Sequence, residues 1–403
     1  MSNAYIGKIA AVIVSLCMTF FFNKELIARE IPTKTDLPAN VAAVAFDRSN
    51  DVTYQFSGYL NDYLEGVSGW AKSAPERNQG MLDMLSDRER QPYRYLMPWG
   101  GEFVGKYLVG AAELYRLNKD PQLKKVIDSF VDKLQQLQAK NGYLGPWPEK
   151  YELTCDVPKD AFCGWADVTW DLWGHYHLML GLTLWYQDTG NTKALDVGCK
   201  IGDMLCDKYL GKVGVMAKLK DSYTNLSPGH SLFLLYKATN NKRYLDLAKQ
   251  IIEEEFPRSV NHVNFALSGK EFYQNPFHGA VRWENAHELL GIAEMYWLTG
   301  EKKYRTAFEH IWWSIVKSDR YNTGTFASGE GVRGSPYNKL SKETCCAVAW
   351  EAMGVEMLRM TGNSVVADEL ELTFLNAVLA YQKRNGEWCT YDTPMDGIRF
   401  TRT

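Results

Sequence analysis

The chain has 403 residues, 46% of them hydrophobic, and a formal net charge of −3. That length allows one large or two ordinary domains with a sizeable core, and a near-neutral charge without any basic block argues against nucleic acid as a partner. The 13 Trp, 23 Tyr and 17 Phe residues are enough to line a concave site as well as a core, which favours a carbohydrate partner, whose C–H faces stack on such rings.

The N-terminal segment, residues 1–28, is predicted to be a signal peptide for export. Lys8 precedes an apolar run over residues 9–22, which has the length of a secretory h-region and is too short to span a bilayer comfortably. Cleavage is expected near Ala28, with an uncleaved N-terminal anchor as the alternative. The protein is therefore expected to be periplasmic or secreted, with no stable membrane span, and residues 29–403 are predicted to form the folded domain.

A helical hairpin with a short polar turn recurs along the chain. Its copies begin near residues 112, 182, 232, 293 and 355, as in "AELYRLNKDPQLKKVIDSF" and "AEMYWLTGEKKYRTAFEHI". Each copy is an apolar helix that ends in a short polar turn and is followed by a second, amphipathic helix. Hydrophobic residues at i, i+3, i+4 and i+7 mark the apolar helix over residues 108–115 and again over residues 289–296. Gly190, Gly300 and Gly362 suit the left-handed residue that ends a helix, and Asn240 is an acceptable substitute.

The spacing of the hairpins predicts an all-α fold, an (α/α)6-type barrel or toroid. The turn threonines Thr189, Thr239, Thr299 and Thr361 lie 50, 60 and 62 residues apart, and such a period indicates a closed or solenoidal array. Long loops rich in Gly, Pro and aromatic residues interrupt the hairpins, and in a toroid they would gather at one rim and build a pocket. Five hairpins are visible, and residues 54–70 could supply part of a sixth.

The eight cysteines are too sparse for a disulfide scaffold. Cys199 and Cys206 lie about 10.5 Å apart along a predicted helix, too far for a bridge, so core packing is expected. Cys155 and Cys163 flank a loop and could pair in an oxidising compartment.

The stretch "SKETCCAVAWEAM", residues 341–353, places a carboxylate and two thiols just before a predicted helix. Glu343 and Cys345 can converge on one ion, and thiolate with carboxylate is an acceptable zinc set. The helix dipole is expected to lower the thiol pKa values. The alternative is that Cys345 and Cys346 are small buried hydrophobic residues, because this motif leaves a zinc site two ligands short. A disulfide between these neighbours would be strained and is not expected.

Several motifs in the same order resemble the β-L-arabinofuranosidase family of glycoside hydrolases, family 127. They are "PWGGEFVGKYLVGAAELYRL" at 98, "NGYLGPWPE" at 141, "WDLWGHYHLMLGLTLWYQDTGN" at 170, and "ETC" followed by "ELELTFLNAVLAYQKRNGEWCTYDTPMDG". The resemblance implies an (α/α)-barrel catalytic domain followed by β-sandwich domains. It also implies a zinc ion held by the Glu and Cys of "ETC" and by a later Cys–Cys pair, one member of which is the nucleophile.

Carried over by motif, Glu343 and Cys345 match the first two zinc ligands, and Glu330 in "TGTFASGEG" is the best match to the acid/base. The alternative interpretation of Glu330 is a solvated loop carboxylate. Cys346 has no counterpart in the family pattern, and Cys389 comes before the place of the later pair. The sequence to Thr403 contains no such pair, so we expect a version truncated before it and before the β-sandwich domains, with weak or no activity alone.

Three residues are candidates for contacting a sugar. Trp99 in "MPWGGEF" could stack on a ring or be a core tryptophan. The H-x-H pair in "WGHYH" suggests a metal, but residues two apart on a helix point in different directions. The resemblance implies a substrate-contacting histidine near this place, and His177 fits its register better than His175; a buried structural histidine is the alternative. His278 in "NPFHGAVRWEN" could contact substrate or only pack a loop.

The expected protein is an exported glycosidase that releases terminal arabinofuranose or a similar sugar from an oligosaccharide or polysaccharide, with zinc as its metal. Another (α/α)-toroid enzyme, such as an unsaturated uronyl hydrolase or polysaccharide lyase, is the alternative without zinc. A non-catalytic glycan-binding relative is the alternative outside enzymes.

Overall fold

Residues 38–403 form one compact unit, and all the described helices and strands belong to it. The computed structural model describes residues 37–45, 52, 54–158, 167–276, 283–326, 331–337, 342–385, 389–393 and 401–402. The signal-peptide prediction, Glu330, His278 and Cys163 lie outside these ranges.

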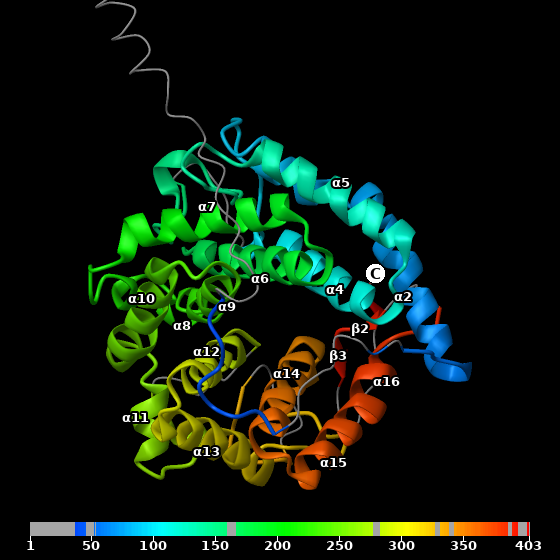
Figure 1. Cartoon of the computed structure of the whole chain (residues 1–403), viewed down its shortest axis with the longest axis vertical. Helices are drawn as coiled ribbons and strands as arrows, with labels where there is room; N and C mark the ends of the chain where they lie inside the picture. Colours follow the sequence, from blue (N-terminus) through cyan, green and yellow to red (C-terminus); the bar gives the residue numbers. More distant parts are fainter. Residues whose placement is uncertain are drawn as a thin grey trace, which may run out of the picture. The chain divides into compact units, whose positions relative to one another are not determined.

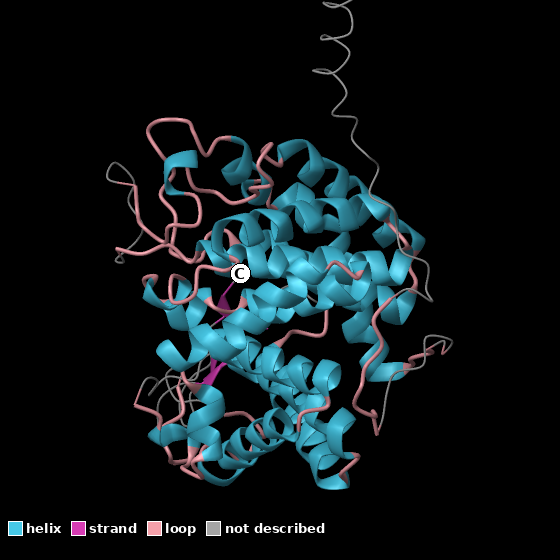
Figure 2. Cartoon of the chain, turned by 60° about the vertical axis from the view of Figure 1, so that its left-hand side comes forward, coloured by secondary structure: helices cyan, strands magenta, loops and turns pink. Residues whose placement is uncertain are grey.

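Five helical hairpins follow one another, and each gives one helix to an inner ring and one to an outer ring (Figures 1 and 2). The inner helices, each packed on the next, are α4 (Glu102–Asn118), α6 (Asp171–Thr189), α9 (Pro228–Thr239), α12 (Trp283–Thr299) and α14 (Thr344–Thr361). Their outer partners are α5 (Pro121–Leu137), α7 (Thr192–Tyr209), α10 (Lys242–Gln250), α13 (Lys302–Ser318) and α15 (Ser364–Thr373). The predicted (α/α) toroid is thereby confirmed.

The division into rings follows the distribution of polar side chains. Helices α6 and α12 are buried on nearly every side, as expected of helices that are covered all round. The outer helices α5 and α10 are amphipathic and bury a single face. Before the first hairpin, α2 (Gly58–Arg77) packs on α4 and α5, and α3 (Gly80–Ser86) follows it. Among the described helices, none fills the inner ring between α14 and α4 (Figure 1).

Two outer helices continue past their last α-helical turn. A π-helical turn follows α10 over Ile251–Glu255, and another follows α15 over Phe374–Val378 and leads into α16 (Leu379–Tyr381). Two short helices, α8 (Ser222–Asn225) and α11 (His262–Leu267), lie in the connections between hairpins. No described helix is long and apolar enough to cross a membrane.

Four of the hairpin turns are built in the same way. The hydroxyl of Thr189 donates to Trp185 O at 2.5 Å and accepts from the N–H of Asn191 at 3.3 Å. Between them Gly190 has φ +71°, and the side chain of Asn191 caps the next helix by accepting from Ala194 N–H. The same threonine bonds occur at Thr239, Thr299 and Thr361. The turn sequence thus satisfies the free backbone groups at two helix ends.

Two two-stranded antiparallel ribbons complete the described structure. Strand β1 (Lys342–Glu343) pairs with β3 (Asp392–Thr393), with Glu343 opposite Asp392, and β2 (Cys389–Thr390) pairs with β4 (Thr401–Arg402). The first ribbon holds residues 389–393 against the start of α14.

The cysteines on α7 behave as predicted. Cys199 and Cys206 are free, buried thiols of the hydrophobic core. Cys155 is also a free, buried thiol; because Cys163 lies outside the described residues, its proposed pairing stays a prediction.

Candidate active site

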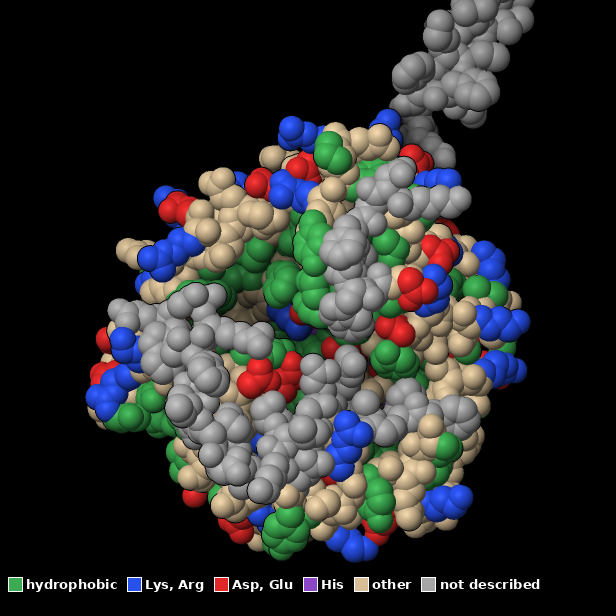
Figure 3. All heavy atoms as spheres, turned by 180° about the vertical axis from the view of Figure 1, so that it is seen from behind, with side chains coloured by type: hydrophobic (Ala, Val, Ile, Leu, Met, Phe, Trp, Pro, Cys, Tyr) green, Lys and Arg blue, Asp and Glu red, His purple; other side chains and the backbone are tan. Residues whose placement is uncertain are grey.

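The N-terminal ends of neighbouring inner helices lie together. Trp170, just before α6, donates its N–H to Pro98 O, just before α4, at 2.9 Å. Asn285, at the start of α12, donates its side-chain N–H to Tyr223 O, in the connection before α9, at 3.1 Å. Residues that lie far apart in the sequence therefore meet at one rim, where loops leave the toroid. One face of the molecule is hollowed near its centre, and hydrophobic side chains with a few acidic and basic ones border the hollow (Figure 3).

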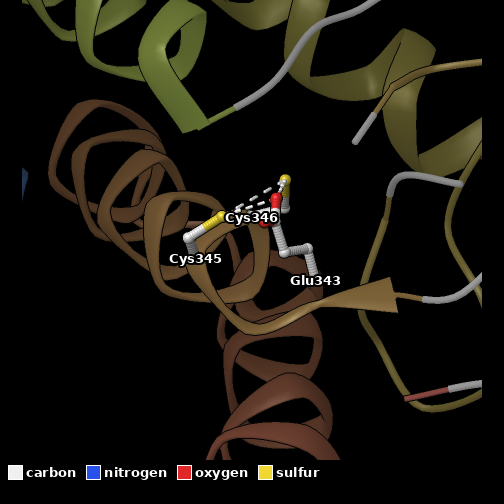
Figure 4. A group of neighbouring side chains, drawn as sticks. All are labelled: Glu343, Cys345 and Cys346. Atoms are coloured by element: carbon white, nitrogen blue, oxygen red, sulfur yellow. Dashed lines mark hydrogen bonds between the residues drawn. The ribbon is translucent and has the colours of Figure 1, made fainter. Parts of the chain in front are cut away.

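Glu343, Cys345 and Cys346 bring three donor atoms together at the start of α14 (Figure 4). Cys345 Sγ lies 2.8 Å from Glu343 Oε2, Cys346 Sγ lies 3.8 Å from the same oxygen, and the two sulfur atoms are 4.0 Å apart. The structure thus brings together the two predicted ligands and adds the thiol of Cys346.

Backbone contacts fix this turn. Glu343 is the residue before α14, but its side chain makes no capping hydrogen bond and is turned toward the thiols. Thr344 instead anchors the start of α14 to residues 390 and 391. Its N–H donates to Tyr391 O at 2.9 Å, and its hydroxyl donates to Thr390 O at 2.6 Å.

The predicted lowering of the thiol pKa values is wrong. Burial raises the pKa of Cys345 well above 9, and the neighbouring Cys346 and Glu343 raise it further. The hydrogen bond with Cys345 lowers the pKa of Cys346, but burial together with Glu343 and Glu284 raises it overall. Loss of water and nearby negative charge both disfavour a thiolate, and here they outweigh the helix terminus.

Two residues near the thiols were missed by sequence reasoning. Tyr391 hydrogen-bonds with Cys345 and Glu343, and burial first, then these two groups, raise its pKa. Glu284 is buried at the start of α12 and acts electrostatically on Cys346. Tyr391 could have been noticed because its segment, "CTYDT", belongs to the family resemblance. No spacing rule, however, predicts that Tyr391 contacts Cys345.

A second cluster, of aromatic rings and histidines, lies inside the ring. Trp173, Tyr176 and His177 of α6 contact Trp283 and His287 of α12, with ring centroids 5.3 to 6.3 Å apart. The hydroxyl of Tyr176 lies 2.6 Å from His287 Nδ1. The backbone N–H of Trp283 hydrogen-bonds with Cys346, so this cluster adjoins the thiols.

Several nitrogen atoms in this cluster have no hydrogen-bond partner within the described structure. They are both ring nitrogens of His177, Nε2 of His287 and Nε1 of Trp283, and all are buried. Burial first, and then the charge of Lys106 for His177 or of His230 for His287, lowers the pKa of both histidines well below 6.5, so both are neutral at pH 7. A neutral imidazole offers one donor and one acceptor, which suits a sugar hydroxyl.

The two histidines of "WGHYH" have separate roles, as helix geometry predicts. His175 is held by the backbone: its Nδ1 lies 2.8 Å from Asp171 O, and Leu144 N–H donates to its Nε2 at 3.2 Å. His177 faces the cluster on α12. Trp99 is half-buried and packs against Trp170 at the rim, with ring centroids 5.3 Å apart.

The donor set at α14 fits a zinc ion chemically. Zinc binds carboxylate and thiolate ligands in tetrahedral sites, and one carboxylate oxygen and two sulfur atoms lie within 4.8 Å of one another here. In the described residues this is the one group of three or more His, Cys, Asp and Glu side chains with such spacing.

Comparison with known proteins agrees with this picture. A family model described as "Beta-L-arabinofuranosidase, GH127 catalytic domain" matches residues 44–402. A non-reducing end β-L-arabinofuranosidase of Bifidobacterium longum subsp. longum is 26% identical over 326 residues, which are 73% of this chain and 49% of that protein.

Solved structures show the same fold. A GH127 β-arabinofuranosidase superposes with a TM-score of 0.68 at 22% identity, covering 90% of this chain and 58% of the other. A GH127 β-L-arabinofuranosidase from Geobacillus stearothermophilus T6 superposes with a TM-score of 0.66 at 19% identity, covering 85% and 58%. The chain spans about half the length of these relatives.

Proposed function

This chain belongs to the GH127 β-L-arabinofuranosidase family, and from that premise we propose that it takes part in hydrolysing a terminal β-L-arabinofuranosyl residue of a glycan at the rim where the inner helices begin. The relative from Bifidobacterium is described as acting at the non-reducing end, so an exo mode of attack on an oligosaccharide or polysaccharide is part of the proposal. Export to the periplasm or the medium, where such glycans are met, is proposed as well.

The residues that hold the sugar come from the cluster between α6 and α12. His177 is neutral and would donate one hydrogen bond to the sugar and accept another. His287 would bond the sugar through Nε2 alone, because its Nδ1 already bonds Tyr176, and Trp283 Nε1 would donate one bond. Their buried nitrogen atoms lack partners in the described structure, and a sugar hydroxyl would satisfy them, which matters because an unpaired buried polar group costs about 1–3 kcal/mol. Trp99 would stack on the ring of the sugar, and His278 would also contact it.

Glu330 is proposed as the general acid and base. It would protonate the oxygen of the leaving group while a thiolate, in place of the second carboxylate of a retaining glycosidase, attacks the anomeric carbon. It would then take a proton from the water that releases the sugar from that sulfur. For this role its pKa would have to be raised above that of an exposed glutamate by burial.

Zinc is the metal we propose, with Glu343 and Cys345 among the residues that hold it. When bound, zinc would keep a ligand sulfur deprotonated and oriented. Glu343 and Tyr391 already position Cys345 by hydrogen bonds, so little rearrangement of the protein is required.

The observation that carries the proposal is the set of unpartnered buried nitrogens beside the thiol pair. Release of p-nitrophenol from p-nitrophenyl β-L-arabinofuranoside, against the α-anomer, tests it. We expect only weak turnover of the β-anomer by this chain, and a further loss of about 10- to 100-fold in kcat/KM in His177→Ala, since one or two substrate hydrogen bonds disappear.

His310→Ala is the matched control, because His310 lies on the outer helix α13 and binds Lys270 O. It should leave kcat/KM unchanged. Release from neither anomer, together with loss of the absorbance of an unsaturated uronoside, would overturn the proposal in favour of a uronyl hydrolase.

A further inference from the structure

Cys346 takes no part in the site that the family resemblance implies, yet its sulfur lies beside both predicted ligands. The side chain is fully buried, and Sγ is 3.8 Å from Glu343 Oε2 and 4.0 Å from Cys345 Sγ. We propose that Cys346 is a third metal ligand, so that "ETCC" by itself supplies a three-donor site with a fourth position open. The proposal rests on the metal site proposed above.

The distances agree with tetrahedral coordination. With Zn–S near 2.3 Å and Zn–O near 2.1 Å, two sulfur ligands of one ion lie about 3.8 Å apart, and a sulfur and an oxygen lie about 3.6 Å apart. The contacts of Cys346, at 4.0 and 3.8 Å, are within about 0.2 Å of these values. The contact between Cys345 and Glu343, at 2.8 Å, is that of a thiol hydrogen bond, and it would lengthen by about 0.8 Å when an ion replaces the shared proton.

The protein around Cys346 is arranged as it commonly is around a metal-bound sulfur. The backbone N–H of Trp283 hydrogen-bonds with Cys346, and donors of this kind stabilise a metal-bound thiolate. The anchored Thr344 fixes the backbone between Glu343 and the thiols. The donor set is therefore held in place by residues 390 and 391 and by α12.

Other roles explain less of this geometry. A disulfide requires about 2.05 Å between sulfur atoms, whereas Cys345 and Cys346 are free thiols 4.0 Å apart. Packing alone explains why Cys346 is buried, but it does not explain why its sulfur points at a carboxylate that makes no capping bond. Three protein ligands with one open position is the arrangement of catalytic zinc sites.

Cobalt(II) is the probe for counting the thiolates, because the intensity of the thiolate-to-cobalt charge-transfer band rises with their number. Metal-free wild-type protein titrated with Co²⁺ should show a band of two thiolates. Cys346→Ser and Cys345→Ser should each lose about half of its intensity, and each should bind Zn²⁺ at least about 10-fold more weakly in competition with a chromophoric chelator. Cys206→Ser, a buried thiol on α7 whose Sγ donates to Arg243 O, should change neither quantity.

X-ray absorption at the zinc edge counts the sulfur ligands directly in the wild-type protein, without any substitution. Two sulfur atoms at about 2.3 Å in wild-type protein support the proposal, and loss of one of them in Cys346→Ser assigns it. One sulfur per zinc, or unchanged cobalt and zinc binding in a folded Cys346→Ser, overturns it. These spectra do not depend on whether the protein cleaves arabinofuranosides. The proposed function and the proposal that Cys346 is a metal ligand can therefore be overturned independently.

Discussion

Burial, more than position at a helix start, sets the protonation of single side chains in this protein. The thiols at the start of α14 show this, and so does Glu351 on the same helix. Glu351 is half-buried, its Oε1 has no partner in the described structure, and burial raises its pKa to about 8. Its neighbours along that face of α14, Val348 and Val355, are exposed and apolar, so the local sequence alone marks Glu351 as an ordinary surface carboxylate.

Glu351→Gln is expected to make the protein less sensitive to pH. In the unfolded chain the carboxyl group ionises near its ordinary value of 4.5, whereas in the folded protein it stays protonated to about pH 8. The unfolded state therefore binds fewer protons between these values, and the wild-type protein loses stability as pH rises through that range. The Tm of the variant should equal or approach that of the wild type at pH 5 and exceed it at pH 8.

Glu371→Gln serves as the comparison, because Glu371 is exposed on α15. The difference in Tm from wild type should be the same at both pH values. An equal difference at pH 5 and 8 for Glu351→Gln would show that its carboxyl group titrates normally in the folded protein.

Among the elements, α4 and α6 pack more closely than ordinary side chains allow. A Cβ placed on Gly105 of α4 would lie 2.3 Å from the carbonyl carbon of His177, and one on Gly181 of α6 would lie 2.6 Å from Leu108 Cβ. The two backbones are therefore in direct contact, and this contact positions the turn of α6 that carries His177.

Gly105→Ala should destabilise the protein by at least about 1–3 kcal/mol, the usual cost of overpacking. The added Cβ would meet the backbone of His177, which cannot move away as a flexible side chain can. The shift of α6 should also weaken turnover in the folded fraction. Chemical denaturation and the arabinofuranoside assay measure the two effects.

Gly110→Ala is the matched substitution on α4, since nothing lies within 4 Å of the added Cβ. It should stabilise the protein by about 0.5–1 kcal/mol through helix propensity. Equal effects of the two alanines would mean that the close approach at Gly105 does not limit packing.

In the whole molecule, the last hairpin meets the first described helix. Arg384, just after α16, lies 3.2 Å from Asp62 Oδ2 on α2 and 3.5 Å from the centre of the Tyr59 ring. Asp62, Gly66 and residues 383–385 also line an open groove of about 460 Å³. The ion pair between Arg384 and Asp62 joins residues more than 300 positions apart, yet both side chains are 47% exposed.

Arg384→Ala should therefore lower the free energy of unfolding by only about 1 kcal/mol, the sum expected for one exposed ion pair and one cation–π contact. The loss should shrink in high salt. Arg258→Ala, which removes an exposed ion pair with Glu254 four residues away, should cost about 0.3–0.5 kcal/mol. A loss well above 2 kcal/mol for Arg384→Ala would show that the ring depends on this contact.

The sequence by itself determined the hairpins. Their helices rest on apolar spacing within one or two turns, and their connections rest on Thr, Gly and Asn side chains that bond backbone within four residues. Such short-range interactions depend only on residues that are close together in the sequence, so the toroid and the Glu343–Cys345 pair could be predicted.

Only the tertiary structure decided which distant side chains meet and how they are charged. The contacts of Cys346 with Trp283 and of Cys345 with Tyr391 join residues 63 and 46 positions apart, and no local pattern encodes those distances. The thiol pKa values were predicted in the wrong direction because desolvation depends on every element that covers a group, whereas the helix dipole can be inferred from one helix alone.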